Sequence, residues 1–343
     1  MRKNEIFCST DFWKKFSMDR AIVSRNQFDD DGESLECWWK YYRMIKRSSI
    51  NFEFDEKYIV DSNDETLQRI WQEVANGDKP KETFVCSSKP NITYDNIQTD
   101  ASLLRALYLT HETPISKYGI ISASESEYLS KHEFFKDSGE AIEKGTHDSW
   151  NRLLSNSKHQ FNAMVVMDNY IFHDRPDFNL SEILETLLPK EIDVPFHLTI
   201  VASTERVAYD ELAKDKKHER ISIEEYTEKR REKIISLIHN IRPSLAKNLE
   251  VETFRMDKRY VHDRTILTNY MLLYAGGGFN LFGKDKETGE NKAGKSTKLC
   301  AVYPRFIEHG GWEELYNIFI KDILDGLKSI GKSSKNRLLI KDS

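Results

Sequence analysis

The chain has 343 residues, enough for two ordinary domains or one large one with well-formed cores. Its formal net charge is −5, so no global positive field draws it to nucleic acid or anionic lipid, and any such binding must come from a local patch. The four cysteines are scattered without metal-binding spacing, no apolar run approaches the ~20 residues of a membrane helix, and the first residues lack the apolar core of a signal peptide. We therefore expect a reduced, cytoplasmic protein without a transmembrane segment.

Strand-like and helix-like runs alternate through the first 150 residues. The strand-like runs lie at residues 6–10, 50–54, 83–86, 106–110 and 120–123, and helix-like runs lie at residues 36–46 and 65–75. Pro114 favours the start of a short helix, and Gly119 ends it. This alternation predicts an α/β domain with a mostly parallel sheet.

A second alternation follows the polar stretch at residues 136–158. Its strand-like runs lie at 161–167, 197–202 and 299–302, and its helix-like runs lie at 180–188, 210–241 and 312–327. The helix at 210–241 interleaves Glu with Lys and Arg, which is typical of a solvated helix face. We predict two α/β domains, at residues 1–150 and 158–328, whose mixed or parallel sheets are flanked by helices. A basic, mobile tail is expected at 329–343.

The most informative stretch runs from Leu249 to Phe282. An apolar, alternating segment leads to His262-Asp263-Arg264, a strand-like run covers residues 265–275, and three glycines follow. Glycines let main-chain N–H groups approach an anion closely, and Arg binds phosphate through two parallel hydrogen bonds. The candidate phosphate-binding residues are His262, Arg264, Asn269, Gly276, Gly277 and Gly278. The alternative is that His262 caps a strand and Arg264 pairs with a neighbouring acid.

Residues from about 160 to 325 resemble the phospholipase D-like C-terminal domain of eukaryotic proteins that carry an N-terminal microtubule-interacting-and-transport (MIT) domain. The resemblance rests on Asp168-Asn169-Tyr170-Ile171 after a strand, a long charged helix, and His262-Asp263-Arg264 followed by a strand and the glycines. The wider phospholipase D signature is His-x-Lys-x4-Asp, in which His attacks a phosphodiester while Lys and Asp bind the phosphate and orient the ring. Here the positions read His262, Arg264 and Asn269, and one convincing copy is found where such enzymes need two. The resemblance therefore implies a phosphate-recognising module rather than a catalyst.

Residues 1 to about 150 resemble PIN-domain nucleases. That family sets carboxylates at the carboxyl ends of parallel strands, where they hold Mg²⁺ or Mn²⁺ ions that activate water. The residues that carry the resemblance are Asp11, Asp100 and Glu112, with Glu36 or Glu65 as a supporting helix acid. Glu112 stands where the family usually has Asp. The alternative is that Asp11 and Asp100 cap the helices that follow them.

Together, the two resemblances predict a metal-dependent nuclease of a bacterial conflict or anti-phage defence type. Its first domain would cut, and its second would recognise a phosphate-bearing ligand such as RNA or single-stranded DNA. One alternative is a non-catalytic binding or scaffold protein that engages a protein partner, a lipid headgroup or a nucleic acid. Another is a phosphodiesterase that works through His262 in a homo-oligomer, across a dimer.

Overall fold

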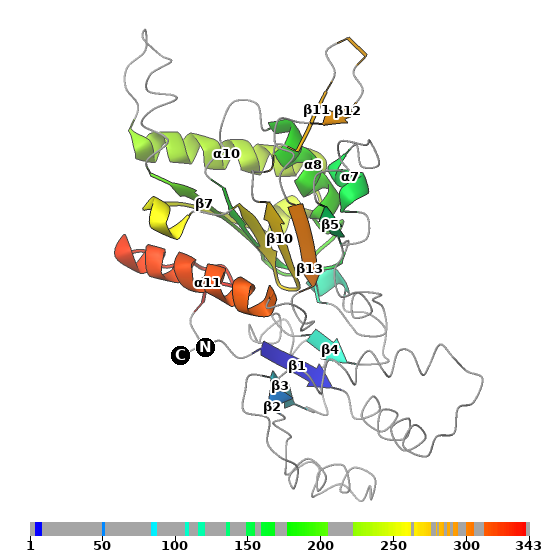
Figure 1. Cartoon of the computed structure of the whole chain (residues 1–343), viewed down its shortest axis with the longest axis vertical. Helices are drawn as coiled ribbons and strands as arrows, with labels where there is room; N and C mark the ends of the chain where they lie inside the picture. The colour runs from blue at the N-terminus through cyan, green and yellow to red at the C-terminus, as the bar shows by residue number, and fades with distance from the viewer. Residues whose placement is uncertain are drawn as a thin grey trace, which may run out of the picture. The chain divides into compact units, whose positions relative to one another are not determined.

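The chain is described from a computed structural model. The structure describes residues 4–8, 50–51, 84–87, 107–109, 116–120, 135–137, 149–154, 159–168, 177–204, 222–261, 264–275, 279, 281–284, 287–288, 291–293, 300–304 and 312–340. The chain divides into two units, one of residues 1–132 with 306–313 and one of residues 133–305 with 314–343, and each is described separately (Figure 1).

The described strands of the first unit form a parallel sheet. They are β1 (Asn4–Cys8), β2 (Ile50–Asn51), β3 (Phe84–Ser87) and β4 (Leu107–Leu109), in the spatial order β2-β3-β1-β4. Ile6 of β1 pairs with Cys86 on one side and Leu107 on the other, so β1 has a parallel neighbour on both sides. A short 3-10 helix, η2 (Ser116–Tyr118), follows and ends at Gly119, whose φ of 67° favours glycine. The helices predicted at 36–46 and 65–75 lie outside the described residues.

A seven-stranded mixed sheet forms the centre of the second unit, in the order β5-β13-β10-β9-β6-β7-β8. Its strands are β5 (Phe135–Asp137), β6 (Ala163–Met167), β7 (Phe196–Ser203), β8 (Leu249–Met256), β9 (Thr265–Thr268), β10 (Met271–Ala275) and β13 (Cys300–Pro304). β6, β7 and β8 run parallel to one another, whereas the other neighbours pair antiparallel. β11 (Phe282–Lys284) and β12 (Asn291–Ala293) pair separately as an antiparallel ribbon.

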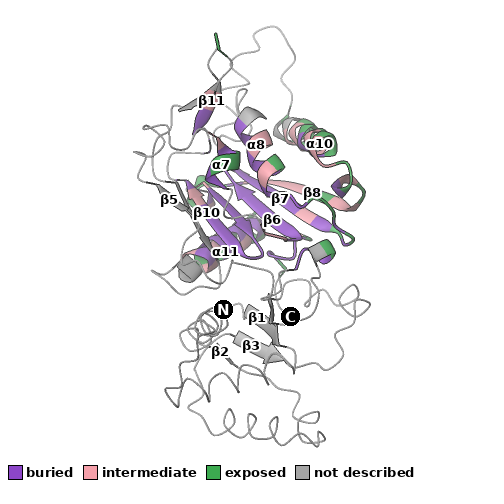
Figure 2. Cartoon of the chain, turned by 90° about the vertical axis from the view of Figure 1, so that its right-hand side faces the viewer, coloured by how far each residue is buried: buried purple, intermediate pink, exposed green. Residues whose placement is uncertain are grey.

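Helices cover both faces of this sheet. They are α7 (Trp150–Leu153), α8 (Asp177–Leu187), α10 (Ile223–Ile241) and α11 (Trp312–Ser329), with short 3-10 helices η5 (Leu245–Asn248) and η6 (Lys258–Tyr260) on either side of β8. α7, α8 and α10 lie over one face, and α11 lies over the other (Figures 1 and 2). Because both faces are covered, β6 and β9 are buried along their whole lengths. The chain is an α/β protein, as the alternation of elements predicts.

α11 is held against the sheet by aromatic residues and by one close backbone approach. The Tyr316 hydroxyl donates to the Thr268 carbonyl at 2.6 Å, and the Phe319 ring stacks on Tyr274 with centroids 6.4 Å apart. Further along the helix, a Cβ added at Gly326 would lie 2.3 Å from Met256 Sδ and 3.2 Å from Tyr260 Cβ, so any larger residue there would have to displace these side chains.

The charged helix predicted at 210–241 is observed from Ile223 onwards as α10, and residues 205–221 lie outside the described residues. Ile234 and Ile238 are buried, whereas the charged side faces solvent and carries ion pairs such as Lys229–Glu225 at 2.8 Å. None of the helices in the described parts of the chain is long and apolar enough to cross a membrane.

The segment after α11 differs from the expected mobile tail. Gly331 adopts a φ of 65° and turns the chain back, and residues 336–339 are then buried against the sheet. We call residues 332–340 the C-terminal clasp. Its sequence combines basic and polar residues with a short apolar run, Leu338-Leu339-Ile340, of which Leu338 and Leu339 are buried. Asn336 and Arg337 are buried because they find partners on the sheet, which no local pattern in the sequence reveals.

Candidate functional site

The first candidate site lies where the parallel strands β1 and β4 end. Cys8, the last residue of β1, pairs with Leu109, the last residue of β4. Asp11 and Glu112 each follow these paired residues by three positions. Since neighbouring parallel strands end at one edge of a sheet, the two segments that carry these acids start side by side.

The four predicted nuclease carboxylates, Asp11, Glu36, Asp100 and Glu112, lie outside the described residues. Within the described ranges, no group of three or more His, Cys, Asp or Glu side chains could hold a metal ion. Carboxylate oxygens are the ligands that Mg²⁺ and Mn²⁺ prefer, so this donor set fits such an ion.

The second candidate site lies at the carboxyl end of β6. The antiparallel register of β6 and β9 pairs Met167 with Thr265, so the next pair across the two strands is Asp168 and Arg264. Arg264 Nε lies 4.0 Å from Asp168 Oδ1, and the two side chains are 20% and 3% exposed. A carboxylate buried this deeply needs a compensating cation. Arg264 thus pairs with an acid, while part of its side chain still reaches the surface.

Asn269 lies at the opposite end of β9 from Arg264. Its side chain is fully buried, and its Oδ1 accepts hydrogen bonds from the main-chain N–H groups of Asn162 at 3.2 Å and Ala163 at 2.9 Å. Five residue steps along an extended strand span roughly 16 Å, too far for Arg264 and Asn269 to hold one phosphate. The structure therefore separates Asn269 from Arg264 within the predicted phosphate-binding set. Asn269 instead holds the start of β6 in place.

His262 and the glycines Gly276 to Gly278 lie outside the described residues, but their described neighbours place the chain on either side of them. Ala275, immediately before the glycines, donates its N–H to the Arg264 carbonyl at 2.9 Å. The end of β10 is therefore at the same edge of the sheet as the pair formed by Arg264 and Asp168.

On the far side of the glycines, Asn179 of α8 fixes the chain. Its Oδ1 accepts from Trp150 Nε1 at 2.8 Å and from the Phe282 N–H at 3.2 Å, while its Nδ2 donates to the Phe282 carbonyl at 3.0 Å. The rings of Phe279 and Phe282 pack edge-on against Trp150. The sequence analysis missed Asn179. The only sequence feature that pointed to it was its position directly before the helix predicted at residues 180–188.

Comparison with protein-family models finds none that matches the chain, and comparison with curated proteins finds no match either. The phospholipase D-like and PIN-like resemblances therefore stay predictions.

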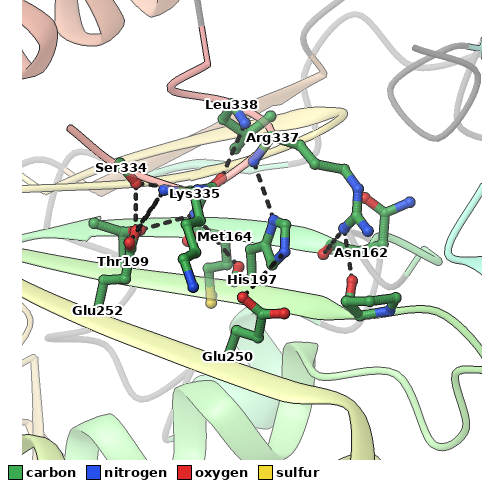
Figure 3. A network of polar contacts seen from close by, with 12 residues as sticks. Asn162, Met164, His197, Thr199, Glu250, Glu252, Ser334, Lys335, Arg337 and Leu338 are labelled. Atoms are coloured by element: carbon green, nitrogen blue, oxygen red, sulfur yellow. Dashed lines mark hydrogen bonds and ion pairs between the residues drawn. The ribbon is translucent and has the colours of Figure 1, made fainter. Parts of the chain in front are cut away.

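The third polar cluster lies at the amino ends of β6, β7 and β8, where the C-terminal clasp crosses these strands (Figure 3). Asn336 Nδ2 donates to the Met164 carbonyl at 2.9 Å and to Thr199 Oγ1 at 3.0 Å. On β8, Glu252 accepts from the Lys335 N–H at 3.1 Å and from the Ser334 hydroxyl. The clasp thus makes contacts with all three strands.

Arg337 is the innermost cation of the clasp, at 4% exposure. Its Nη1 donates to the carbonyls of Pro195 at 2.6 Å and Asn162 at 3.3 Å. Its main-chain N–H donates to His197 Nδ1 at 3.2 Å, so the ring proton of a neutral His197 sits on Nε2, which lies 3.7 Å from Glu250 Oε2. Because Nδ1 is occupied in this way, His197 is positioned for structure rather than for proton transfer.

Burial, together with the smaller effects of the positive charges of Arg337 and Lys335, lowers the pKa of His197 from its ordinary value of 6.5 to about 4. Sequence reasoning missed this residue as well, because a His at the start of a strand carries no local signal of a partner 140 positions away.

Proposed function

We propose that the chain is a metal-dependent nuclease whose first unit cuts phosphodiester bonds and whose second unit binds a phosphate-bearing ligand. The observation that carries this proposal is the register of β1 and β4, in which Cys8 pairs with Leu109. Asp11 and Glu112 follow these residues by equal distances in sequence. Carboxyl ends of neighbouring parallel strands are where α/β proteins bind their ligands, so the register supports a shared role for the two acids.

Asp11, Asp100 and Glu112 would hold Mg²⁺ or Mn²⁺, with Glu36 in support. The bound ion would supply an activated water and stabilise the leaving oxygen of the scissile phosphodiester. The contribution of the chain itself would be to gather negative oxygen ligands at one edge of the sheet, where they would attract a divalent cation and position it against a phosphate.

In the second unit, Arg264 supports phosphate recognition. The buried carboxylate of Asp168 lies beside its guanidinium at the sheet edge, and a guanidinium held in place loses less conformational freedom when it binds a phosphate. His262 and the backbone of Gly276 to Gly278 are the further candidates at this edge. A phosphodiesterase that works through His262 has less support, because Asn269, the third residue of its signature, lies at the other end of β9.

Labelled RNA and single-stranded DNA incubated with the purified full chain test the nuclease proposal. We expect cleavage with Mn²⁺ that EDTA abolishes and that Asp11→Asn and Glu112→Gln reduce to background, since each removes one anionic ligand while keeping the side-chain shape. Glu191→Gln, at an exposed acid in the second unit, is the matched control and keeps wild-type cleavage. Cleavage that persists in EDTA, or in Asp11→Asn, would contradict the proposal.

A further inference from the structure

A run of cations lies along the carboxyl edge of the parallel strands in the second unit. β8 is the outermost strand and β9 lies beyond both β7 and β6, so the chain between β8 and β9 must pass the ends of those two strands. Its described part includes η6, where Lys258 and Arg259 are exposed. With Arg255 before them and Arg264 after them, four cations come from ten consecutive residues of a chain whose net charge is −5.

The register of the strands orders Arg255 and Arg264 within this edge. Ala202 of β7 pairs with Arg255 of β8, Met167 of β6 pairs with Val201 of β7, and Arg264 is opposite Asp168. The result is a row across four neighbouring strands, all on the α8 and α10 face, consisting of Arg264, Asp168, Ala202 and Arg255. Three strand spacings of about 4.8 Å place the backbones of the two arginines roughly 14 Å apart.

Three of these cations, Arg255, Arg259 and Arg264, are oriented by their surroundings, and Arg264 lies beside Asp168 as described above. Arg255 Nε donates to Thr227 Oγ1 of α10 at 2.7 Å, and its Nη1 donates to the Ser203 carbonyl at 3.3 Å. The Arg259 guanidinium lies 4.7 Å from the centre of the Tyr260 ring, although its side chain is 66% exposed. The same ten residues contain two acids in sequence, Asp257 and Asp263, against the four cations. The Asp257 carboxylate lies 3.9 Å from Arg259 Nε.

We propose that four described cations, Arg255, Lys258, Arg259 and Arg264, which we call the basic edge, bind the phosphodiester backbone of a nucleic-acid strand. The Arg255 guanidinium is held by Thr227 and Ser203, and the Arg264 guanidinium lies beside Asp168, three strands away, so the two cations are set in series. They match a ligand that carries phosphates in series. Guanidinium groups suit this role because they bind phosphate through two parallel hydrogen bonds. The inference deepens the proposed function, since it names the ligand of the second unit as a nucleic-acid strand.

The test measures binding in EDTA, where metal-dependent cleavage cannot occur. Fluorescein-labelled RNA and DNA strands of one sequence, about 20 nucleotides long, are titrated with the full chain and followed by fluorescence anisotropy. The edge variant is Lys258→Glu with Arg259→Glu, both at exposed positions. The matched control is Lys190→Glu with Lys247→Glu, an equal change of charge at exposed positions outside the basic edge.

We expect the edge variant to bind at least about tenfold more weakly than the wild type, and the control to bind within about twofold of it. The slope of log affinity against log salt should fall by roughly one or two for the edge variant, because fewer phosphate contacts release fewer counterions. Whichever of RNA and DNA binds more tightly is identified as the source of the phosphodiester backbone.

The inference is overturned if the edge and control variants bind the strands equally. It is also overturned if the edge variant binds both strands as the wild type does but loses the binding to anionic vesicles that the wild type shows. The outcome is separable from that of the nuclease proposal. If Mn²⁺-dependent cleavage is absent while the edge variant still loses binding in EDTA, the nuclease proposal fails and the basic edge stands. If Asp11→Asn abolishes cleavage but the edge variant binds like the control, the nuclease proposal stands and the inference about the basic edge fails.

Discussion

The two ends of the parallel strands β6, β7 and β8 use cations in opposite ways. At the amino end, Arg337 of the C-terminal clasp is 4% exposed and donates to main-chain carbonyls. At the carboxyl end, Arg259 of the basic edge is 66% exposed, and Arg264 keeps part of its side chain at the surface. A buried guanidinium can only exchange partners by unfolding its surroundings, whereas an exposed one exchanges water for a ligand. The amino end therefore stabilises the fold, and the carboxyl end is where recognition is expected.

The largest expected effect is at the amino end, for Arg337→Ala. The substitution removes the Arg337 donor from the Pro195 carbonyl and opens space beneath the clasp. It also removes one donor from the Asn162 carbonyl, which keeps the His197 N–H at 3.0 Å. We expect the free energy of unfolding to fall by about 2–4 kcal/mol, measured from urea denaturation curves. Binding of RNA by the protein that remains folded should be unchanged.

Lys335→Ala is the control for Arg337→Ala. Lys335 is exposed, and its bond to Glu252 is made by the main-chain N–H, which the substitution keeps. We expect a change within about 0.5 kcal/mol. Equal stability of the Arg337→Ala variant and the wild type would show that the clasp does not hold the amino end of the sheet.

Asn269→Ala is expected to have the next largest effect. It removes the acceptor for the N–H groups of Asn162 and Ala163, which are buried at the start of β6. We expect a loss of about 1–3 kcal/mol in unfolding free energy and unchanged nucleic-acid binding by the folded protein. Asn240→Ala, at an exposed position on α10, should change neither. If the Asn269→Ala variant instead bound nucleic acid more weakly at unchanged stability, Asn269 would belong to the phosphate site, and the two ends of the sheet would not differ in the way proposed.

The sequence located elements whose pattern is local. The strand predicted at 161–167 is observed as β6 (Ala163–Met167), and the helix predicted at 312–327 is observed as α11 (Trp312–Ser329). Apolar runs and helical spacing are properties of neighbouring residues, so they survive in any fold that buries them.

The same reasoning failed where the answer depends on a turn or on distant contacts. The run from Thr265 to Ala275 was predicted as one strand-like segment, but it is two antiparallel strands, β9 and β10, joined at Asn269-Tyr270. Asn is a turn former, and its place inside the run was the available signal. The polar contacts of the clasp had no local signal, since the bond from Asn336 to Met164 joins residues 172 positions apart. The short apolar run Leu338-Leu339-Ile340 was the only local signal of burial there, and the basic composition predicted mobility instead.

The smallest expected effect concerns pH and again separates the two ends. The pKa of His197 is about 4 in the folded protein, below its ordinary value of 6.5, mainly because the ring is buried. As the pH falls through 6.5, the unfolded chain takes up the proton first, so the stability that depends on neutral His197 is complete above 6.5 and is lost as the pH falls towards 4. Protonation of Nδ1 would also remove the acceptor for the Arg337 N–H. Glu250, 3.7 Å from Nε2, favours the charged ring, but it is 45% exposed and screened by solvent.

We expect the wild type to lose about 1–2 kcal/mol of unfolding free energy between about pH 7 and about pH 5 through this residue. The measurement compares urea denaturation at both values for the wild type and for His197→Gln, whose pH dependence should be shallower by that amount. His239→Gln, at an exposed position in α10, should keep the wild-type dependence. An NMR titration of the His197 ring with a midpoint near 6.5 would contradict this prediction, because it would mean that the clasp opens before the sheet unfolds. The cations at the amino end could then exchange their partners for solvent, as those of the basic edge can.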